Sequence, residues 1–200
     1  MRKSEAPKRN SKFETRNSKL RTRKSPAISP TFDFRFSNSD PRALDSRPRT
    51  LIVGYGNPLR SDDGFGWHAG HLLGQELAGQ DAEVITCHQL TPELAEPLSQ
   101  CRRAVFIDAD AQGKPGKIHH HAVRPQPAAC SAFTHTCTPS GLLSSAQELY
   151  GHRPQALIIT VSAQSFAFGD SLSPVVAAAL PKVVGHVCQW VRAAGTARMK

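Results

Sequence analysis

Strand-like runs alternate with helix-like segments from residue 50 onward, and this alternation limits the possible folds more than any other feature of the chain. Runs rich in β-branched residues lie at 50–54, 82–87, 104–110, 117–123 and 156–162, with helical patterns between most of them. Such alternation is typical of parallel sheets covered by helices. We therefore predict one α/β domain over residues 50–195. It should have three αβα layers, with a mostly parallel, twisted central sheet of about five strands.

Three of the predicted helices carry a start signal, which is a Ser or Thr followed by Pro. The pairs are Thr91–Pro92, Thr138–Pro139 and Ser173–Pro174. Ser and Thr are favoured N-caps, and Pro fits the first helical position because its missing N–H would have no partner there. We expect a helix after each pair, the last of them over 175–195. The apolar face of residues 65–77 predicts a further helix.

The excess positive charge of the chain is confined to its first quarter. The formal net charge is +9, and residues 1–50 contain 14 Lys or Arg against 5 Asp or Glu, whereas residues 51–200 contain 11 of each. The first segment has no helical or strand period and cannot bury enough apolar area to offset the entropy of ordering. We predict a disordered basic extension over residues 1–49. A nucleic-acid-binding arm, a transit peptide and a translated leader are alternatives; we favour an extension without a chemical role and expect no nucleic-acid partner.

The cysteines favour a reducing compartment. Their number, five, is odd and no pair has C-x-x-C spacing, so neither a disulfide framework nor a zinc ribbon is indicated. We expect small, partly buried thiols in a cytoplasmic protein. The chain shows no apolar run long enough to cross a bilayer, so we expect no membrane partner.

Acidic side chains gather where the predicted strands end. Asp62 and Asp63 follow the first strand, Asp108 and Asp110 close the third, and His135 lies in an irregular stretch before a helix start. Ligands of open α/β sheets bind at the carboxyl ends of the strands. We therefore expect these three loops to converge on one edge of the sheet.

Two carboxylates and one imidazole would form a mixed oxygen and nitrogen ligand set with open positions, suited to nickel or zinc. A metal ion there could polarise a carbonyl group and lower the pKa of a bound water, as hydrolysis requires. Each residue also has an ordinary structural explanation, because Asp often caps helices and closes turns. Only the convergence of three loops favours the metal site.

The same stretch argues against nucleotide binding. Gly54 and Gly56 follow a strand, but the third glycine of a G-x-G-x-x-G fingerprint would fall at Leu59. The carboxylates of Asp62 and Asp63 would repel a phosphate at a helix N-terminus. We expect Asp62 to orient the loop by capping the helix that follows it, and the glycines to allow close backbone approach or positive φ.

The run His119–His121 looks like a metal-binding tract. In a strand its members alternate between two faces, so at most His119 and His121 could share an ion. We favour an exposed edge strand over a metal site.

Four blocks of sequence carry a resemblance to a known family. They are "VGYGNPLRSDDGFG" (53–66), "FIDADAQGKPGKI" (106–118), "THTCTPSGLL" (134–143) and "SFAFGDSLSPVVAAALP" (165–181). In order and spacing they resemble the hydrogenase maturation proteases, the endopeptidases that remove a C-terminal peptide from the large subunit of nickel-iron hydrogenases. The resemblance covers nearly all of residues 50–195.

The resemblance implies a metal-dependent endopeptidase in which Asp63, Asp108 and His135 are both the nickel ligands and the catalytic residues. Asp63 matches the second acid of the motif G-N-x-L-x-x-D-[DE]-G, where the best-known members have Glu. A second departure is "VSAQSF" (161–166), where Pro or Gly and then Glu would be expected. The implied partner is the hydrogenase large-subunit precursor, which supplies the nickel. We expect a monomer.

The alternative is a non-catalytic module on the same fold. It would dock on a nickel site or a hydrogenase subunit without cleaving it, and the shorter acid at Asp63 would mark the lost activity. Retention of all three implied ligands favours the enzyme.

Overall fold

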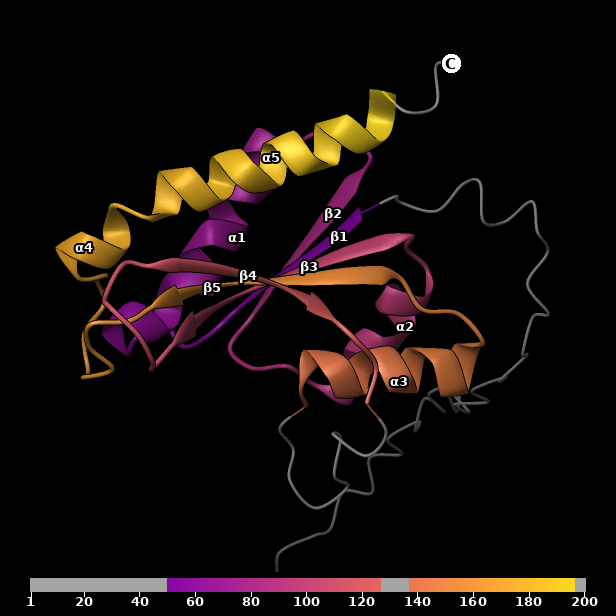
Figure 1. Cartoon of the computed structure of the whole chain (residues 1–200), viewed down its shortest axis with the longest axis horizontal. Coiled ribbons are helices and arrows are strands. Elements are labelled where there is room, and N and C mark those ends of the chain that lie inside the picture. The colour runs from indigo at the N-terminus through magenta and orange to yellow at the C-terminus, as the bar shows by residue number, and fades with distance from the viewer. Residues whose placement is uncertain (1–49, 127–136, 197–200) are drawn as a thin grey trace, which may run out of the picture. The chain divides into compact units, whose positions relative to one another are not determined.

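A computed structural model describes residues 50–126 and 137–196 of the chain, with side chains up to residue 193. All of them belong to one compact unit, 38–200, and the predicted extension over residues 1–49 lies outside the described residues. The described strands form one sheet in the order β2-β1-β3-β5-β4 (Figure 1). They are β1 (Thr50–Tyr55), β2 (Ala82–Cys87), β3 (Arg103–Asp110), β4 (Ile118–Val123) and β5 (Gln155–Ser162).

The sheet is mixed and mostly parallel, which confirms the predicted fold class. β1 pairs in parallel with β2 and β3, and β3 pairs in parallel with β5. β4 runs antiparallel to β5 and forms an edge of the sheet, as favoured for the histidine run.

Helices cover both faces of the sheet. α1 (Phe65–Glu76) and α5 (Leu180–Thr196) lie on one face, and α2 (Ala95–Ser99) and α3 (Pro139–Tyr150) lie on the other (Figure 1). Alternate side chains of each strand serve the two layers because successive strand residues point to opposite faces. Ile52 joins the cluster under α1 and α5, whereas Leu51 and Val53 join the cluster under α2 and α3.

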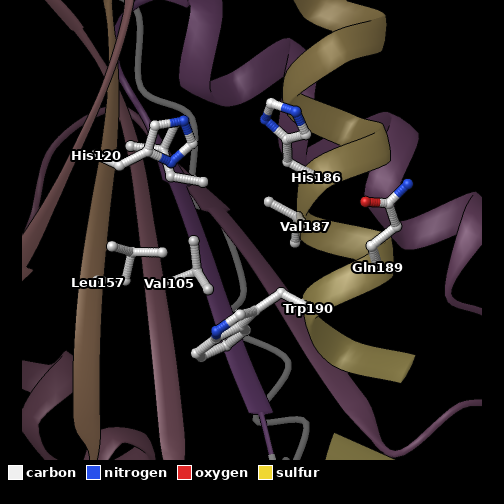
Figure 2. Close-up of a pocket in the computed structure, with 8 residues that line it drawn as sticks. Val105, His120, Leu157, His186, Val187, Gln189 and Trp190 are labelled. Atoms are coloured by element: carbon white, nitrogen blue, oxygen red, sulfur yellow. The ribbon is translucent and has the colours of Figure 1, made fainter. Parts of the chain in front are cut away.

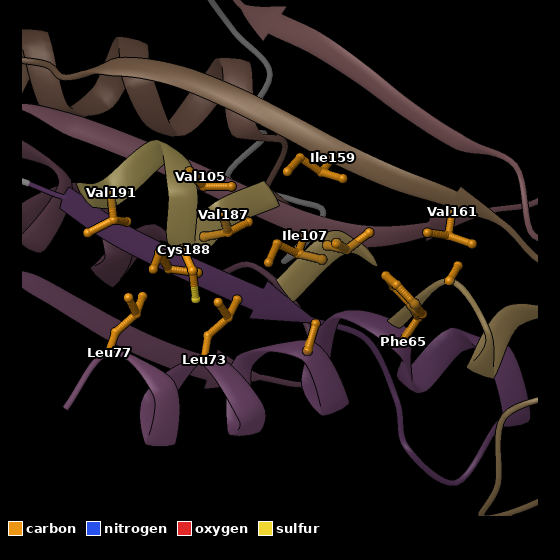
Figure 3. Packing of buried hydrophobic residues seen from close by; sticks show 14 of the residues in the cluster. Phe65, Leu73, Leu77, Val105, Ile107, Ile159, Val161, Val187, Cys188 and Val191 are labelled. Atoms are coloured by element: carbon orange, nitrogen blue, oxygen red, sulfur yellow. The ribbon is translucent and has the colours of Figure 1, made fainter. Parts of the chain in front are cut away.

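Figure 3 shows the first of these clusters, in which side chains of α1, α5 and the sheet meet. Leu73 from α1 and Val187 from α5 are buried against Ile107 of β3. This layer fixes α1, and with it the loop that leads from β1 into α1.

The helix start signals differ in how they act. Thr138 caps α3, because its Oγ1 accepts a hydrogen bond of 3.1 Å from the N–H of Gly141. Thr91 precedes a short 3₁₀ helix, η3 (Pro92–Leu94), which leads into α2, and it makes no side-chain cap. Ser173 precedes α4 (Pro174–Ala177) and likewise makes no side-chain cap.

The prediction of one continuous helix over 175–195 was wrong, because α4 ends at Ala177 and α5 begins at Leu180. Pro181 explains the break, since it has no N–H to donate to the carbonyl four residues earlier. Its position in the first turn of α5 is compatible with helix there.

The stretch Pro174–Ala193 is long and apolar enough, by length and composition, to cross a membrane. The expectation that no run of the chain meets this test was therefore wrong. In the structure Val183, Val187 and Val191 of this stretch are buried against the sheet. These valines form the inward face of α5, although only 33% of the apolar stretch is buried.

Strand order determines where a site can form. The chain leaves β1 through α1 to reach β2 on one side, and later enters β3 on the other side of β1. Such a switch point opens a crevice at the carboxyl ends of the strands. Tyr55 pairs with Cys87 of β2 in the register, and Gly54 pairs with Ile107, the residue before Asp108. The ends of three strands therefore meet where the acidic loops were expected.

Candidate functional site

The loop from β1 to α1 can form only with glycine at two positions. At Gly56 the φ angle is +129°, and an added Cβ would collide with the carbonyl oxygen of Asp63. At Gly54 an added Cβ would collide with the carbonyl oxygen of Gly66. The expectation of positive φ and close backbone approach is confirmed at these positions. These close approaches fold the loop back over the end of β1.

Asp63 lies in a short 3₁₀ helix, η2 (Ser61–Gly64), and is half-buried. Its Oδ2 accepts a hydrogen bond of 3.0 Å from the N–H of Asn57. Asn57 also accepts a 3.0 Å bond through its side chain from the N–H of Leu59. Among the described residues nothing hydrogen-bonds to Oδ1 of Asp63, so this oxygen is left for a ligand.

Asp62 does not have the predicted role of a helix cap. It does not cap α1, because the N-cap residue is Gly64 and no side chain caps this helix. Instead its fully buried carboxylate binds the segment after β5. Oδ2 accepts from the N–H groups of Gln164 and Ser165 at 2.8 and 3.0 Å and from the hydroxyl of Ser173 at 2.9 Å, and Oδ1 accepts from the N–H of Ser173 at 2.7 Å.

The pKa of Asp62 reflects two opposing effects, burial and hydrogen bonding. Burial alone would raise it, but the hydrogen bonds from Ser173, Gln164 and Ser165 outweigh burial and lower the pKa below its ordinary value. Asp62 is thus an ionised structural anchor that fastens residues 164–173 to the β1–α1 loop.

Asp108 lies near the end of β3 and is half-buried. Burial raises the pKa of its carboxyl to about 6, against hydrogen bonds from the Tyr55 hydroxyl and the Ala109 N–H, which lower it. The Ala109 bond is 2.8 Å long. The negative charges of Asp63 and Asp110 raise the pKa further. Asp63 and Asp108 therefore lie close enough to repel each other, as the convergence of their loops predicted.

Tyr55 and Cys87 are part of this site and were missed by the sequence analysis. Burial, followed by the charge of Asp108, raises the pKa of Tyr55 well above its usual range and also raises the pKa of the Cys87 thiol. Both groups are thus protonated at neutral pH, and Tyr55 is a hydrogen-bond donor to Asp108. Aligning the ends of β1, β2 and β3 could have revealed them, because Tyr55 follows the first predicted strand and Cys87 ends the second.

His135, the third predicted ligand, lies outside the described residues, and its place in the site stays a prediction. Within residues 50–126 and 137–193, no group of three or more His, Cys, Asp or Glu side chains is arranged to hold a metal ion. The structure thus brings together two of the three predicted ligands.

His68, in the first turn of α1, supplies an imidazole beside the loop. Burial, and then the nearby His71, lower its pKa, so the ring is neutral at pH 7. Its Nε2 is buried and has no hydrogen-bond partner among the described residues. A Cβ added at Gly64 would lie 3.4 Å from the ring, so His68 packs against Gly64, the residue after Asp63.

The histidines of β4 divide between two faces, as expected for a strand. The rings of His119 and His121 stack with centroids 6.2 Å apart, and Nε2 of His119 lies 3.3 Å from the Ser162 hydroxyl. His120 faces the other way, toward His186 of α5, with centroids 5.6 Å apart.

A cavity of about 370 Å³ lies between the sheet and α5, and it is separate from the acidic loops. Figure 2 shows His120 and His186 on opposite walls at one end and Trp190 at the other, with Val105 and Leu157 on the sheet side. Among the described residues its lining contains two imidazoles and no carboxylate.

Comparisons by sequence find no relatives of the chain. It matches no protein-family model and no curated protein sequence.

Comparisons by structure place the fold. The hydrogenase maturating endopeptidase HybD from E. coli matches with a TM-score of 0.59 at 21% identity, over 74% of this chain and 94% of that one. The [NiFe] hydrogenase maturation protease HycI from Thermococcus kodakarensis matches with 0.60 at 19%, over 76% and 97%. HybD from the same organism matches with 0.56 at 26%, over 72% and 99%. These likenesses confirm the resemblance at the level of the fold.

Proposed function

We propose that the protein is an endopeptidase that removes the C-terminal peptide of a nickel-iron hydrogenase large-subunit precursor after nickel has been inserted. The observation that carries the proposal is the pairing of Asp63 and Asp108 at the switch point of this fold. Their carboxylates stand near each other on the loop and strand that the sequence motifs matched.

The chemistry of these two residues suits a cation brought by the substrate. Two carboxylates that repel each other are a site that a positive charge would stabilise. Asp63 uses only Oδ2 within the described protein. Asp108 is held in place by Tyr55 and the N–H of Ala109. In the proposal both bind the nickel of the precursor, with His135 as the third ligand.

Protonation of Asp108 is coupled to cation binding in this proposal. Without a cation its pKa is about 6, so the carboxyl group is partly protonated near neutral pH and would release its proton when it binds nickel. The Tyr55 hydroxyl keeps the group oriented. A bound nickel ion would add polarisation of the carbonyl group and acidification of the water.

The alternative function is a docking module that binds the same precursor without cleaving it. Asp63 favours this alternative only through its length, since it is shorter by one methylene than the Glu of the best-known family members. The hydrogen bond from the Asn57 N–H to its Oδ2 positions the carboxylate for a ligand in either function. We further propose that the protein acts as a cytoplasmic monomer.

Cleavage of the precursor separates these functions. The protein should be incubated with a nickel-loaded large-subunit precursor, and release of the C-terminal peptide followed by mass spectrometry. We expect cleavage by the unmodified protein, and its loss in Asp63→Asn, Asp108→Asn and His135→Ala. Glu148→Gln, an exposed change on α3, is the matched control and should cleave normally. Binding without cleavage would support the docking module instead.

A further inference from the structure

Two large apolar side chains stand exposed next to the acidic loop. Leu59 is 62% exposed and Phe168 is 92% exposed. They are brought together by a parallel bridge between Arg60 and Gly169. The N–H of Gly169 donates to the carbonyl of Leu59 at 3.1 Å, and the N–H of Ser61 donates to the carbonyl of Gly169 at 2.9 Å. The two side chains therefore come from neighbouring backbones that are distant in sequence.

The segments that carry them are held firmly. The Arg60 guanidinium donates twice to the carbonyl of Phe166, at 3.4 Å each. The buried carboxylate of Asp62 binds the N–H of Ser165, and the hydroxyl of Ser165 accepts from the N–H of Ala167 at 3.2 Å. An exposed apolar pair on a braced backbone can bind a partner without much ordering of the loops, which favours affinity.

The backbone of Leu59 is also linked, through Asn57, to the candidate ligand Asp63. Asn57 accepts a hydrogen bond from the N–H of Leu59 through its side chain, and it donates its own N–H to Asp63. Asn57 thus holds both Leu59 and Asp63, which lie close together in the chain. A partner lying on Leu59 and Phe168 would continue onto the carboxylates.

We propose that Leu59 and Phe168 form the docking surface for apolar side chains in the C-terminal segment of the precursor, next to the peptide bond to be cleaved. This inference rests on the proposed function. The chemistry favours an apolar segment, because both exposed side chains are apolar. Single exposed apolar residues are common, but a fixed pair that adjoins candidate ligands is typical of an interaction site.

The test separates binding from chemistry. Cleavage of a nickel-loaded precursor should be measured with Leu59→Ser, Phe168→Ser and the double variant. We expect KM to rise by about tenfold or more in the double variant, while kcat stays unchanged. A tenfold rise corresponds to the loss of at least one buried apolar contact. Phe168→Leu should recover most of the loss. Leu149→Ser, which alters a side chain that is 58% exposed on α3, should behave like the unmodified protein.

An unchanged KM in the double variant would overturn the proposal. The proposal would also be overturned if the double variant lost self-association, measured by sedimentation, without a change in precursor binding. The surface would then bind a second copy of the chain. If the unmodified protein binds the precursor but does not cleave it, the proposed activity fails. The docking surface is then tested by the affinity for the precursor, which should be weaker in the double variant. If it neither binds nor cleaves, both proposals fail.

Discussion

Asp62 and Asp63 are adjacent in the chain and identical in chemistry, yet their carboxylates have different surroundings. Asp62 is fully buried, and both of its oxygens are occupied by donors from residues 164–173. Asp63 is half-buried, and only its Oδ2 is bonded within the described residues. The first therefore supports the loops, whereas the second is available to a ligand.

Replacing Asp62 by Asn should destabilise the fold. An amide can accept through one oxygen only, and its NH₂ group would face an N–H donor in either orientation. We expect a loss of about 1–3 kcal/mol in the free energy of unfolding, measured by urea denaturation with tryptophan fluorescence. Asp63→Asn is the matched control, and it should cost clearly less because Asp63 is only half-buried. Equal losses in the two variants would contradict the assignment.

The stabilisation by Asp62 should depend on pH. Its pKa is lowered on folding, so its contribution is fully present above the unfolded value of about 3.9 and is lost as the pH falls toward the folded value. The difference in unfolding free energy between the unmodified protein and Asp62→Asn should therefore shrink below about pH 4. If this difference in unfolding free energy stayed constant from neutral pH to pH 3, the assigned role of Asp62 would be wrong.

The residues that sequence patterns can identify are those whose partners are local. Gly56 was predicted to shape the loop, and the backbone that it approaches, at Asp63, is only seven positions away. The partners of Asp62 lie 102 to 111 residues further along the chain. No local pattern contains that information, which is why a helix cap was expected instead of an anchor.

At the scale of elements, the three Ser/Thr-Pro signals show that a start signal and a cap are separate properties. All three precede helical turns, but only Thr138 accepts a hydrogen bond from a backbone N–H of its helix. Ser173 uses its hydroxyl to donate to Asp62 instead. The position of Pro thus marks where a helix begins, while the use of the hydroxyl is decided by what packs nearby.

Removal of the α3 cap should have a measurable effect. Thr138→Ala leaves the N–H of Gly141 without its partner, and we expect a loss of about 1 kcal/mol in the free energy of unfolding. Thr91→Ala removes the same atoms from a helix start without a side-chain cap, and should cost less. Urea denaturation of both variants tests this, and a larger loss for Thr91→Ala would refute the assignment.

Strand and helix positions followed from local periodicity, whereas their connections in space did not. The five strands lie close to the predicted runs, but the antiparallel direction of β4 depends on its pairing with β5. The register that places Tyr55 beside Asp108 likewise depends on strand order. The break before α5 could have been predicted, because Pro181 signals it.

At the scale of the whole molecule, packing and charge are divided along the chain. Both hydrophobic clusters are built from residues between Leu51 and Val191. The net charge of +9 arises from residues 1–50, since residues 51–200 contain equal numbers of acidic and basic residues. The described hydrophobic clusters and the segment that carries the excess charge can therefore be tested separately.

Deletion of residues 1–49 should leave cleavage of the precursor unchanged, because every described residue of the candidate site lies beyond Thr50. The same deletion should abolish retention on heparin at low salt, since the polyanion is attracted by the excess of Lys and Arg in that segment. The full chain in high salt is the control, as screening removes the same attraction. Loss of cleavage by the truncated chain, with its unfolding free energy intact, would show that the basic segment takes part in the function and would favour recruitment through an acidic partner.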